Sequence, residues 1–183
     1  MRLFIATRIN KEIEREVGEF LEQFHRLPGR IKWVEPHNIH ITLKFLGETN
    51  SNEVEPLKQA IAHAAAKTGA FEVHLQSCGV FPNMRAPRVF WIGINDPQKR
   101  LTTLAAKVDS ELTTLGFDPE QRAFSPHLTL GRVKDDDNLE AVKAAFVKAT
   151  FGPLLLRVEK IHLVESQLRP SGPVYKDIAG FEL

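Results

Sequence analysis

Two short segments of the chain nearly repeat each other. Residues 40–43 read His-Ile-Thr-Leu and residues 127–130 read His-Leu-Thr-Leu. Each copy lies in a stretch with the composition of a β-strand and follows a proline, Pro36 or Pro126. Two copies that share both aliphatic positions are not expected by chance. The repeat predicts a fold built from two similar halves, each of which contributes one copy.

Hydrophobic periodicity predicts four helices, each with a single apolar face. They cover residues 10–27, 53–67, 96–115 and 138–150, with Asn10 and Asp96 as N-caps and Pro97 as the first residue of the third. The expected strands are Leu3 to Thr7, Ile31 to Val34, His40 to Leu46, Phe71 to Val80, Val89 to Ile94, His127 to Val133, Leu154 to Glu165 and Val174 to Phe181. Because several strands follow one another directly, we expect an α+β fold with a mixed or antiparallel sheet.

Composition excludes several classes of protein. The 183 residues are 43% hydrophobic, enough for one domain over residues 1–183 or two docked lobes. A net charge of +1 gives no general attraction to long nucleic acids or membranes. One cysteine excludes internal disulfides, and no apolar run reaches the roughly 20 residues of a membrane span. We expect a soluble, cytoplasmic monomer without a signal peptide.

Strand geometry gives the repeat a chemical meaning. Because side chains alternate along a strand, His40, Thr42 and Lys44 should share one face, and the aliphatic residues between them should face a helix. His127 and Thr129 repeat this pattern. If a pseudo-twofold axis relates the halves, two histidines and two threonines meet in one cleft.

Such a cleft suits in-line displacement at phosphorus. The attacking and departing oxygens lie on opposite sides of the phosphoryl group, and each requires the transfer of a proton. Imidazole, with an ordinary pKa of about 6.5, can accept one proton and donate the other. Threonine hydroxyls can donate hydrogen bonds to the phosphate oxygens. This chemistry needs no metal ion.

The paired motifs and their flanks resemble the two-histidine (2H) phosphoesterase superfamily, and within it the bacterial and archaeal 2'-5' RNA ligase (LigT-like), or RNA 2',3'-cyclic phosphodiesterase, family. The resemblance spans nearly the whole chain. The matching segments are Arg2-Leu-Phe-Ile-Ala, Trp33-Val, His40-Ile-Thr-Leu-Lys-Phe-Leu-Gly, Arg122-Ala-Phe-Ser-Pro-His-Leu-Thr-Leu-Gly-Arg132, Leu163-Val-Glu-Ser-Gln-Leu and Gly172-Pro-Val-Tyr175.

The resemblance implies an α+β fold of two pseudo-symmetric lobes, with mostly antiparallel sheets lining a central cleft and helices outside. It implies metal-independent hydrolysis of a terminal ribose 2',3'-cyclic phosphate to a 2'-phosphomonoester, with no cofactor, and a reversible, ATP-independent 2'-5' RNA ligase activity. RNA ends, tRNA halves among them, would be the partners. His40 would be the acid on O3' and His127 the base on water.

Other residues are candidates for binding the substrate. Thr42 and Thr129 would contact the phosphate, and Arg132 would join them if a bulge at Gly131 turned its side chain to the face of His127; otherwise Arg132 makes a surface ion pair. The remaining candidates are Arg122 on the phosphate or RNA backbone, Phe4 as a stacking ring, Ser166 and Tyr175 lining the cleft, and Lys44 steering anions. Core packing is the alternative for Phe4, and a solvated loop position is the alternative for Arg122.

Two other functions remain open at this point. The substrate could be a small cyclic-phosphate nucleotide or an ADP-ribose derivative, or the chain could be a non-catalytic RNA-binding module. The loop of residues 81–87, which includes Arg85, could contact RNA or be a plain surface connection. We interpret residues 135–137, three aspartates, as the cap of the fourth helix rather than as a metal site.

Overall fold

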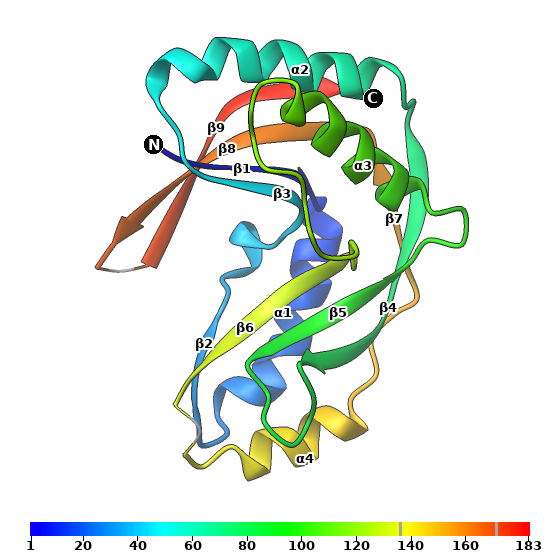
Figure 1. Ribbon diagram of the computed structural model, residues 1–183. Helices are drawn as coiled ribbons and strands as arrows, with labels where there is room; N and C mark the ends of the chain where they lie inside the picture. Colours follow the sequence, from blue (N-terminus) through cyan, green and yellow to red (C-terminus); the bar gives the residue numbers. More distant parts are fainter. Residues whose placement is uncertain (136, 171) are drawn as a thin grey trace.

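The computed structural model describes residues 1–135, 137–170 and 172–183 (Figure 1). These residues form four helices and nine strands, which are interleaved along the chain. The helices are α1 (Lys11–His25), α2 (Val54–Ala66), α3 (Arg100–Thr113) and α4 (Glu140–Lys148), with short 3-10 turns η1 (Pro36–Asn38) and η2 (Ser51–Glu53). The strands are β1 (Arg2–Arg8), β2 (Arg30–Trp33), β3 (His40–Glu48), β4 (Phe71–Phe81), β5 (Val89–Asn95), β6 (His127–Asp135), β7 (Leu154–Val158), β8 (Lys160–Arg169) and β9 (Gly172–Glu182).

The strands form one curved sheet with an internal symmetry. Their order is β7-β4-β5-β6-β3-β1-β8-β9, with β2 also paired to β6, and the described pairs are antiparallel. The two strands that carry the repeated motif, β6 and β3, lie at the centre. We call β3, β1, β8 and β9 the His40 lobe, and β6, β5, β4 and β7 the His127 lobe. The expected α+β fold of two pseudo-symmetric lobes is confirmed.

Helices cover one face of this sheet. In Figure 1, α2 and α3 lie side by side over the His40 lobe, where they contact β3, β8 and β9, while α4 contacts β4 of the His127 lobe and α1. Apolar side chains of all four helices pack with those of both lobes in one continuous core. Among the described residues, no helix lies on the opposite, concave face, which we call the cleft face. The chain crosses between the lobes several times, so the two halves are not two consecutive stretches of sequence.

Two predicted boundaries were wrong. The predicted strand from 154 to 165 breaks at Glu159 into β7 and β8, which lie on different lobes because β7 pairs with β4 and β8 with β1. The third helix begins at Arg100 rather than at Pro97. Asp96 still acts as a cap, because its carboxylate accepts the backbone N–H groups of Arg100 at 2.9 Å and Leu101 at 2.7 Å.

The other two predicted caps had different outcomes. Asn10 is confirmed, since its Oδ1 accepts the N–H of Ile13 at 2.8 Å. The aspartate cap of the fourth helix is wrong: α4 has Leu139 as its N-cap residue, without a side-chain cap, and Asp135 belongs to β6 and pairs with Arg30 at 3.2 Å. Asp136 lies outside the described residues. Of the described helices, none combines the length and apolar character needed to cross a membrane.

Candidate active site

The two histidine motifs meet at the centre of the sheet. The backbones of β3 and β6 pair at Ile41 and Leu128, and both of these side chains are fully buried on the helix-covered face. Their neighbours in each strand therefore face the cleft. In an antiparallel pair, this register places His40 across from Thr129, and His127 across from Thr42. The fold thus brings the four predicted residues together.

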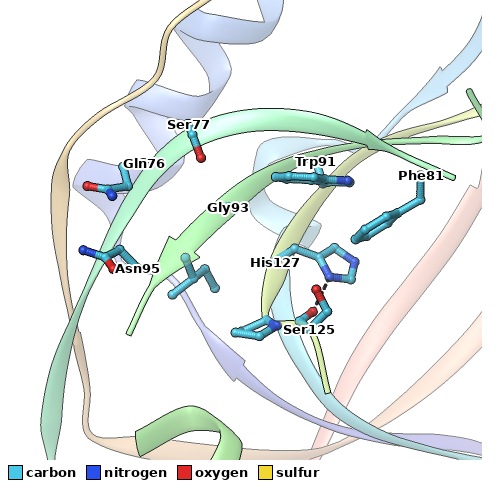
Figure 2. Close-up of a pocket in the computed structure, with 10 residues that line it drawn as sticks. Gln76, Ser77, Phe81, Trp91, Gly93, Asn95, Ser125 and His127 are labelled. Atoms are coloured by element: carbon cyan, nitrogen blue, oxygen red, sulfur yellow. Dashed lines mark hydrogen bonds between the residues drawn. The ribbon is translucent and has the colours of Figure 1, made fainter. Parts of the chain in front are cut away.

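Both imidazoles are held in the same way. Nδ1 of His40 donates a hydrogen bond to the carbonyl of Asn38 at 2.7 Å, and Nδ1 of His127 donates one to the carbonyl of Ser125 at 2.7 Å (Figure 2). A carbonyl oxygen can only accept, so Nδ1 carries the hydrogen in each neutral ring. Nε2 is then the basic atom of each ring, available for proton transfer.

The pKa values of both histidines lie below the ordinary value. Burial, the largest cause, together with the neighbouring Arg8, Arg132 and His127, lowers the pKa of His40 to about 4, although the bond to Asn38 opposes these effects. Burial and the charge of Arg132 also lower the pKa of His127. Both rings are therefore neutral at pH 7 in the free protein, and Arg132 acts on both, as a shared neighbour would.

A matching bulge interrupts each motif strand. The pairing of β3 with β1 shifts at Leu43, and the pairing of β6 with β5 shifts at Leu130. After each shift the alternation of side chains reverses. The bulge turns Arg132 to the cleft face, as the sequence allowed if a bulge formed.

The bulge in β3 shows that the prediction for Lys44 was wrong. Its side chain does not share the face of His40 but lies among the helices, only 7% exposed. Phe45 moves to the cleft face instead and is 66% exposed. Sequence analysis missed Phe45, although the repeat contained the signal: Phe45 is the fifth residue after His40, as Arg132 is the fifth after His127.

Aromatic rings surround His40. Phe4 stacks on its imidazole, with ring centroids 4.8 Å apart and planes inclined by 29°, and Tyr175 meets the same imidazole edge-on at 5.3 Å. Phe4 is only 3% exposed, so it has no free face on which a nucleobase could stack. Its position is that of a support for His40. Phe45, 6.0 Å from Phe4, is the accessible ring.

The outer strands of the His40 lobe add polar groups to the cleft face. Ser166 pairs in register with Tyr175, so both side chains lie on the same side of the sheet, as predicted. Arg8, which sequence analysis missed, lies opposite His40 in β1 and donates a hydrogen bond to Asp177 at 2.6 Å. Asp177 also pairs with His162 at 3.2 Å. Only the strand register, which the sequence does not give, would have revealed Arg8.

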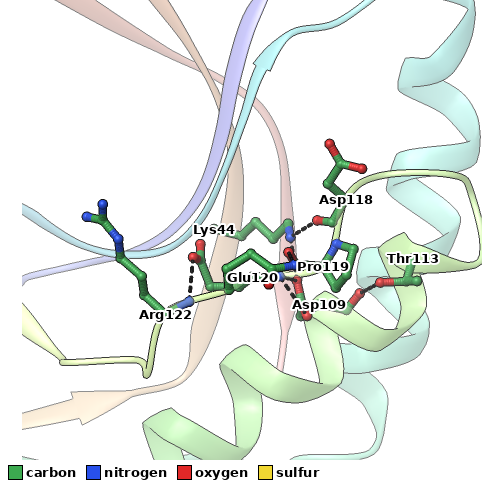
Figure 3. A network of polar contacts seen from close by, with 8 residues as sticks. Lys44, Asp109, Thr113, Asp118, Pro119, Glu120 and Arg122 are labelled. Carbon is green, nitrogen blue, oxygen red and sulfur yellow. Dashed lines mark hydrogen bonds and ion pairs between the residues drawn. The ribbon is translucent and has the colours of Figure 1, made fainter.

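A buried lysine anchors the loop that leads to His127 (Figure 3). The ammonium group of Lys44 donates to the carboxylate of Asp109 in α3 and to the carbonyl of Asp118 at 2.6 Å. Asp109 in turn accepts the N–H of Glu120 at 3.1 Å. The residue that follows His40 by four positions thus ties down the segment just before the second motif.

Arg122 lies in this loop but is exposed, and its charge is not among those that shift the pKa of either histidine. In Figure 3 its side chain extends away from the Lys44 network. A role for Arg122 on the phosphate or the RNA backbone stays a prediction. Within residues 1–135, 137–170 and 172–183, no group of three or more His, Cys, Asp or Glu side chains is arranged to hold a metal ion.

Fold and cleft together define the class of protein. The structure superimposes on a crystal structure of TT0787 from Thermus thermophilus with a TM-score of 0.85 at 29% identity, covering 100% of this chain and 98% of the other. It matches Escherichia coli LigT complexed with 3'-AMP with a TM-score of 0.79 at 26% identity, covering 100% and 96% of the two chains. This is the two-lobed α+β architecture expected from the sequence.

The chain belongs to the 2'-5' RNA ligase superfamily, whose family model matches residues 11–169. Among curated relatives, a protein of Methanocaldococcus jannaschii named RNA 2',3'-cyclic phosphodiesterase is 39% identical over 181 residues, which are 97% of this chain and 98% of that protein. A protein of the same name from Archaeoglobus fulgidus is 35% identical over 183 residues, the full length of both. The resemblance inferred from the paired motifs is confirmed.

Lys44 offers a test of how the loop before His127 is held. Replacing Lys44 with Met should lower the free energy of unfolding by about 1–3 kcal/mol, because Asp109 and the Asp118 carbonyl lose a buried donor. Urea denaturation measures this loss. The control is Lys58→Met, which removes the more exposed ion pair with Glu55 and should cost about 0.5 kcal/mol or less. Equal losses in the two variants would contradict an anchoring role for Lys44.

Proposed function

We propose that this chain is an RNA 2',3'-cyclic phosphodiesterase, which hydrolyses a terminal ribose 2',3'-cyclic phosphate to a 2'-phosphomonoester. Relatives with that name match it along its full length. The observation that carries the proposal is the arrangement of two imidazoles with their Nδ1 atoms held by backbone carbonyls, each across from the threonine of the other motif.

The arrangement supports a concerted in-line reaction at phosphorus. Nε2 of His127 takes a proton from water as the water oxygen bonds to phosphorus, and Nε2 of His40 gives a proton to O3' as the bond from phosphorus to O3' breaks. Thr42, Thr129 and Arg132 stabilise the charge on the non-bridging oxygens. The products are a 2'-phosphate and a free 3'-hydroxyl. His127 then returns its proton to solvent and His40 regains one.

The same site would run the same displacement with a different nucleophile. If the 5'-hydroxyl of a second RNA takes the place of water, the new bond joins O5' to phosphorus and the product is a 2'-5' linkage. One P–O bond replaces another, so no ATP is required. RNA ends, including tRNA halves, are the proposed substrates, and a cytoplasmic monomer is the proposed form of the enzyme.

The acid needs help from the substrate. Because both histidines are neutral at pH 7 in the free protein, His40 can donate a proton only after its pKa rises. The negative charge of a bound phosphodiester beside the ring raises it, since an opposite charge favours the protonated form. Binding of the phosphate and protonation of one imidazole are therefore coupled.

Removal of each histidine tests the proposal. His40→Ala and His127→Ala should each lower the rate of hydrolysis of a cyclic-phosphate-ended RNA by about 10² to 10⁴-fold. The double variant should be little slower than either, because the two groups act as a unit. The measurement is the initial rate in EDTA, with adenosine 2',3'-cyclic phosphate and ADP-ribose 1'',2''-cyclic phosphate compared as small substrates.

Three results would count against it. A wide preference for either small substrate over RNA would replace the RNA assignment with the small-molecule one. A parent protein that binds RNA, turns over no cyclic phosphate and binds equally well without His40 and His127 would instead be a binding module. Strict dependence on an added divalent metal would contradict the paired-histidine mechanism.

The pH dependence follows from the lowered pKa values. The base must be neutral, so the rate falls as pH drops below its pKa; the acid must be charged, so the rate falls as pH rises above its pKa. Since both pKa values lie below 6.5 in the free protein, kcat/KM should follow a bell with its maximum on the acid side of pH 6.5. Bound substrate raises the pKa of the acid, so the kcat profile should lie at higher pH. Superimposable profiles of kcat and kcat/KM would argue against this coupling.

A further inference from the structure

A cavity lies beside His127, on the side away from His40 and its aromatic rings. Its volume is about 350 Å³, and its lining includes Gln76, Ser77, Trp91 and Asn95 (Figure 2). Ligand pockets begin at about this size, so the space suits one nucleoside rather than a longer ligand. None of its described lining residues is a lysine, an arginine or a carboxylate.

The two lobes differ at the position opposite each histidine. Arg8 lies opposite His40 in the register of β1 and β3, and Gly93 lies opposite His127 in the register of β5 and β6. In the His40 lobe, this position carries the guanidinium of Arg8, which pairs with Asp177. In the His127 lobe, Gly93 brings no side chain and lines the cavity. The two sides of the cleft are therefore similar in backbone but differ in chemistry, since the position beside His40 is charged and the one beside His127 is not.

Trp91 forms an aromatic wall of this cavity. Its indole lies flat over Gly79, where an added Cβ would come within 2.4 Å of the ring. Phe81 packs on the indole with centroids 5.1 Å apart and also meets His127 edge-on at 5.1 Å. A continuous series of rings thus leads from the proposed base into the cavity, and aromatic side chains are the usual stacking partners of nucleobases.

The polar groups of the cavity favour a neutral, hydrogen-bonding ligand. Its lining includes the side-chain amides of Gln76 and Asn95 and the hydroxyl of Ser77 (Figure 2). Amides and hydroxyls match the donor and acceptor edges of a base, whereas a phosphate would find no cation here.

We propose that this cavity binds the second nucleoside of a 2'-5'-linked substrate, the one whose 5'-oxygen lies on the His127 side of phosphorus. The inference rests on the proposed function, in which His127 faces the nucleophile. The first nucleoside lies against Phe45 on the other side. With both sites occupied, the 5'-hydroxyl replaces water: O5' bonds to phosphorus, its proton passes to His127, and O3' leaves with the proton of His40. Cleavage of the 2'-5' linkage is the reverse of these transfers.

Inhibition constants separate the two sites. The test measures initial rates on an RNA oligonucleotide that ends in a 2',3'-cyclic phosphate, with two inhibitors: adenosine 2'-phosphate, which has one nucleoside, and adenylyl-2'-5'-adenosine, which has two. In the parent, the dinucleotide should bind more tightly. Trp91→Leu should weaken the dinucleotide on the order of 5- to 100-fold through lost stacking, and leave adenosine 2'-phosphate within about twofold.

Two further variants complete the test. Trp91→Phe retains a smaller stacking ring, so it should give an intermediate loss for the dinucleotide even if the leucine variant folds poorly. Phe45→Leu is the matched control from the other lobe, and it should weaken both inhibitors by the same factor.

Two outcomes would overturn the assignment of the cavity. In the first, the dinucleotide binds the parent no better than adenosine 2'-phosphate. In the second, both Trp91 variants weaken the two inhibitors equally. Turnover of the RNA by the parent shows that the proposed function stands in either case, while absence of turnover means that the proposed function itself has failed.

Discussion

The pairing of Ile41 with Leu128 is the contact on which the site depends. It joins the central strands of the two lobes, and its two buried side chains fix which residues of β3 and β6 face the cleft. If either strand slipped by one residue in this register, its histidine would turn into the core and its aliphatic side chain to solvent. The hydrophobic core that the four helices complete therefore does more than stabilise the chain: it holds the register that presents two imidazoles to one substrate.

The protonation state of the two histidines follows from this placement. Each ring loses solvent, donates Nδ1–H to a carbonyl two residues earlier in the chain and lies within reach of Arg132. These conditions keep both imidazoles of the free site unprotonated beside the positive charge of Arg132. An anionic phosphodiester is the natural complement, because it supplies the charge that one imidazole needs before it can act as an acid. Binding and activation are one event in this account.

Much of this could be predicted from the sequence. The repeated motif and its alternation were enough to place His40, Thr42, His127 and Thr129 together, because both depend on local pattern. The bulge was foreseen at Gly131 but not after Leu43, where no glycine marks it, so Lys44 was expected on the wrong face and Phe45 was missed. The partners of a strand are set by distant residues, which is why the break at Glu159, the position of Arg8 and the cavity beside Gly93 could not be read from the chain alone.

The central claim is that two imidazoles act on opposite sides of one phosphorus atom. A crystal structure with an adenosine vanadate, a five-coordinate mimic of the reacting phosphoryl group, tests it most directly. The account predicts that the two apical oxygens of the vanadate lie within about 2.6–3.2 Å of Nε2 of His40 and of His127, one oxygen on each. Vanadate bound with both imidazoles on the same oxygen, or with only one of them in contact, would contradict it.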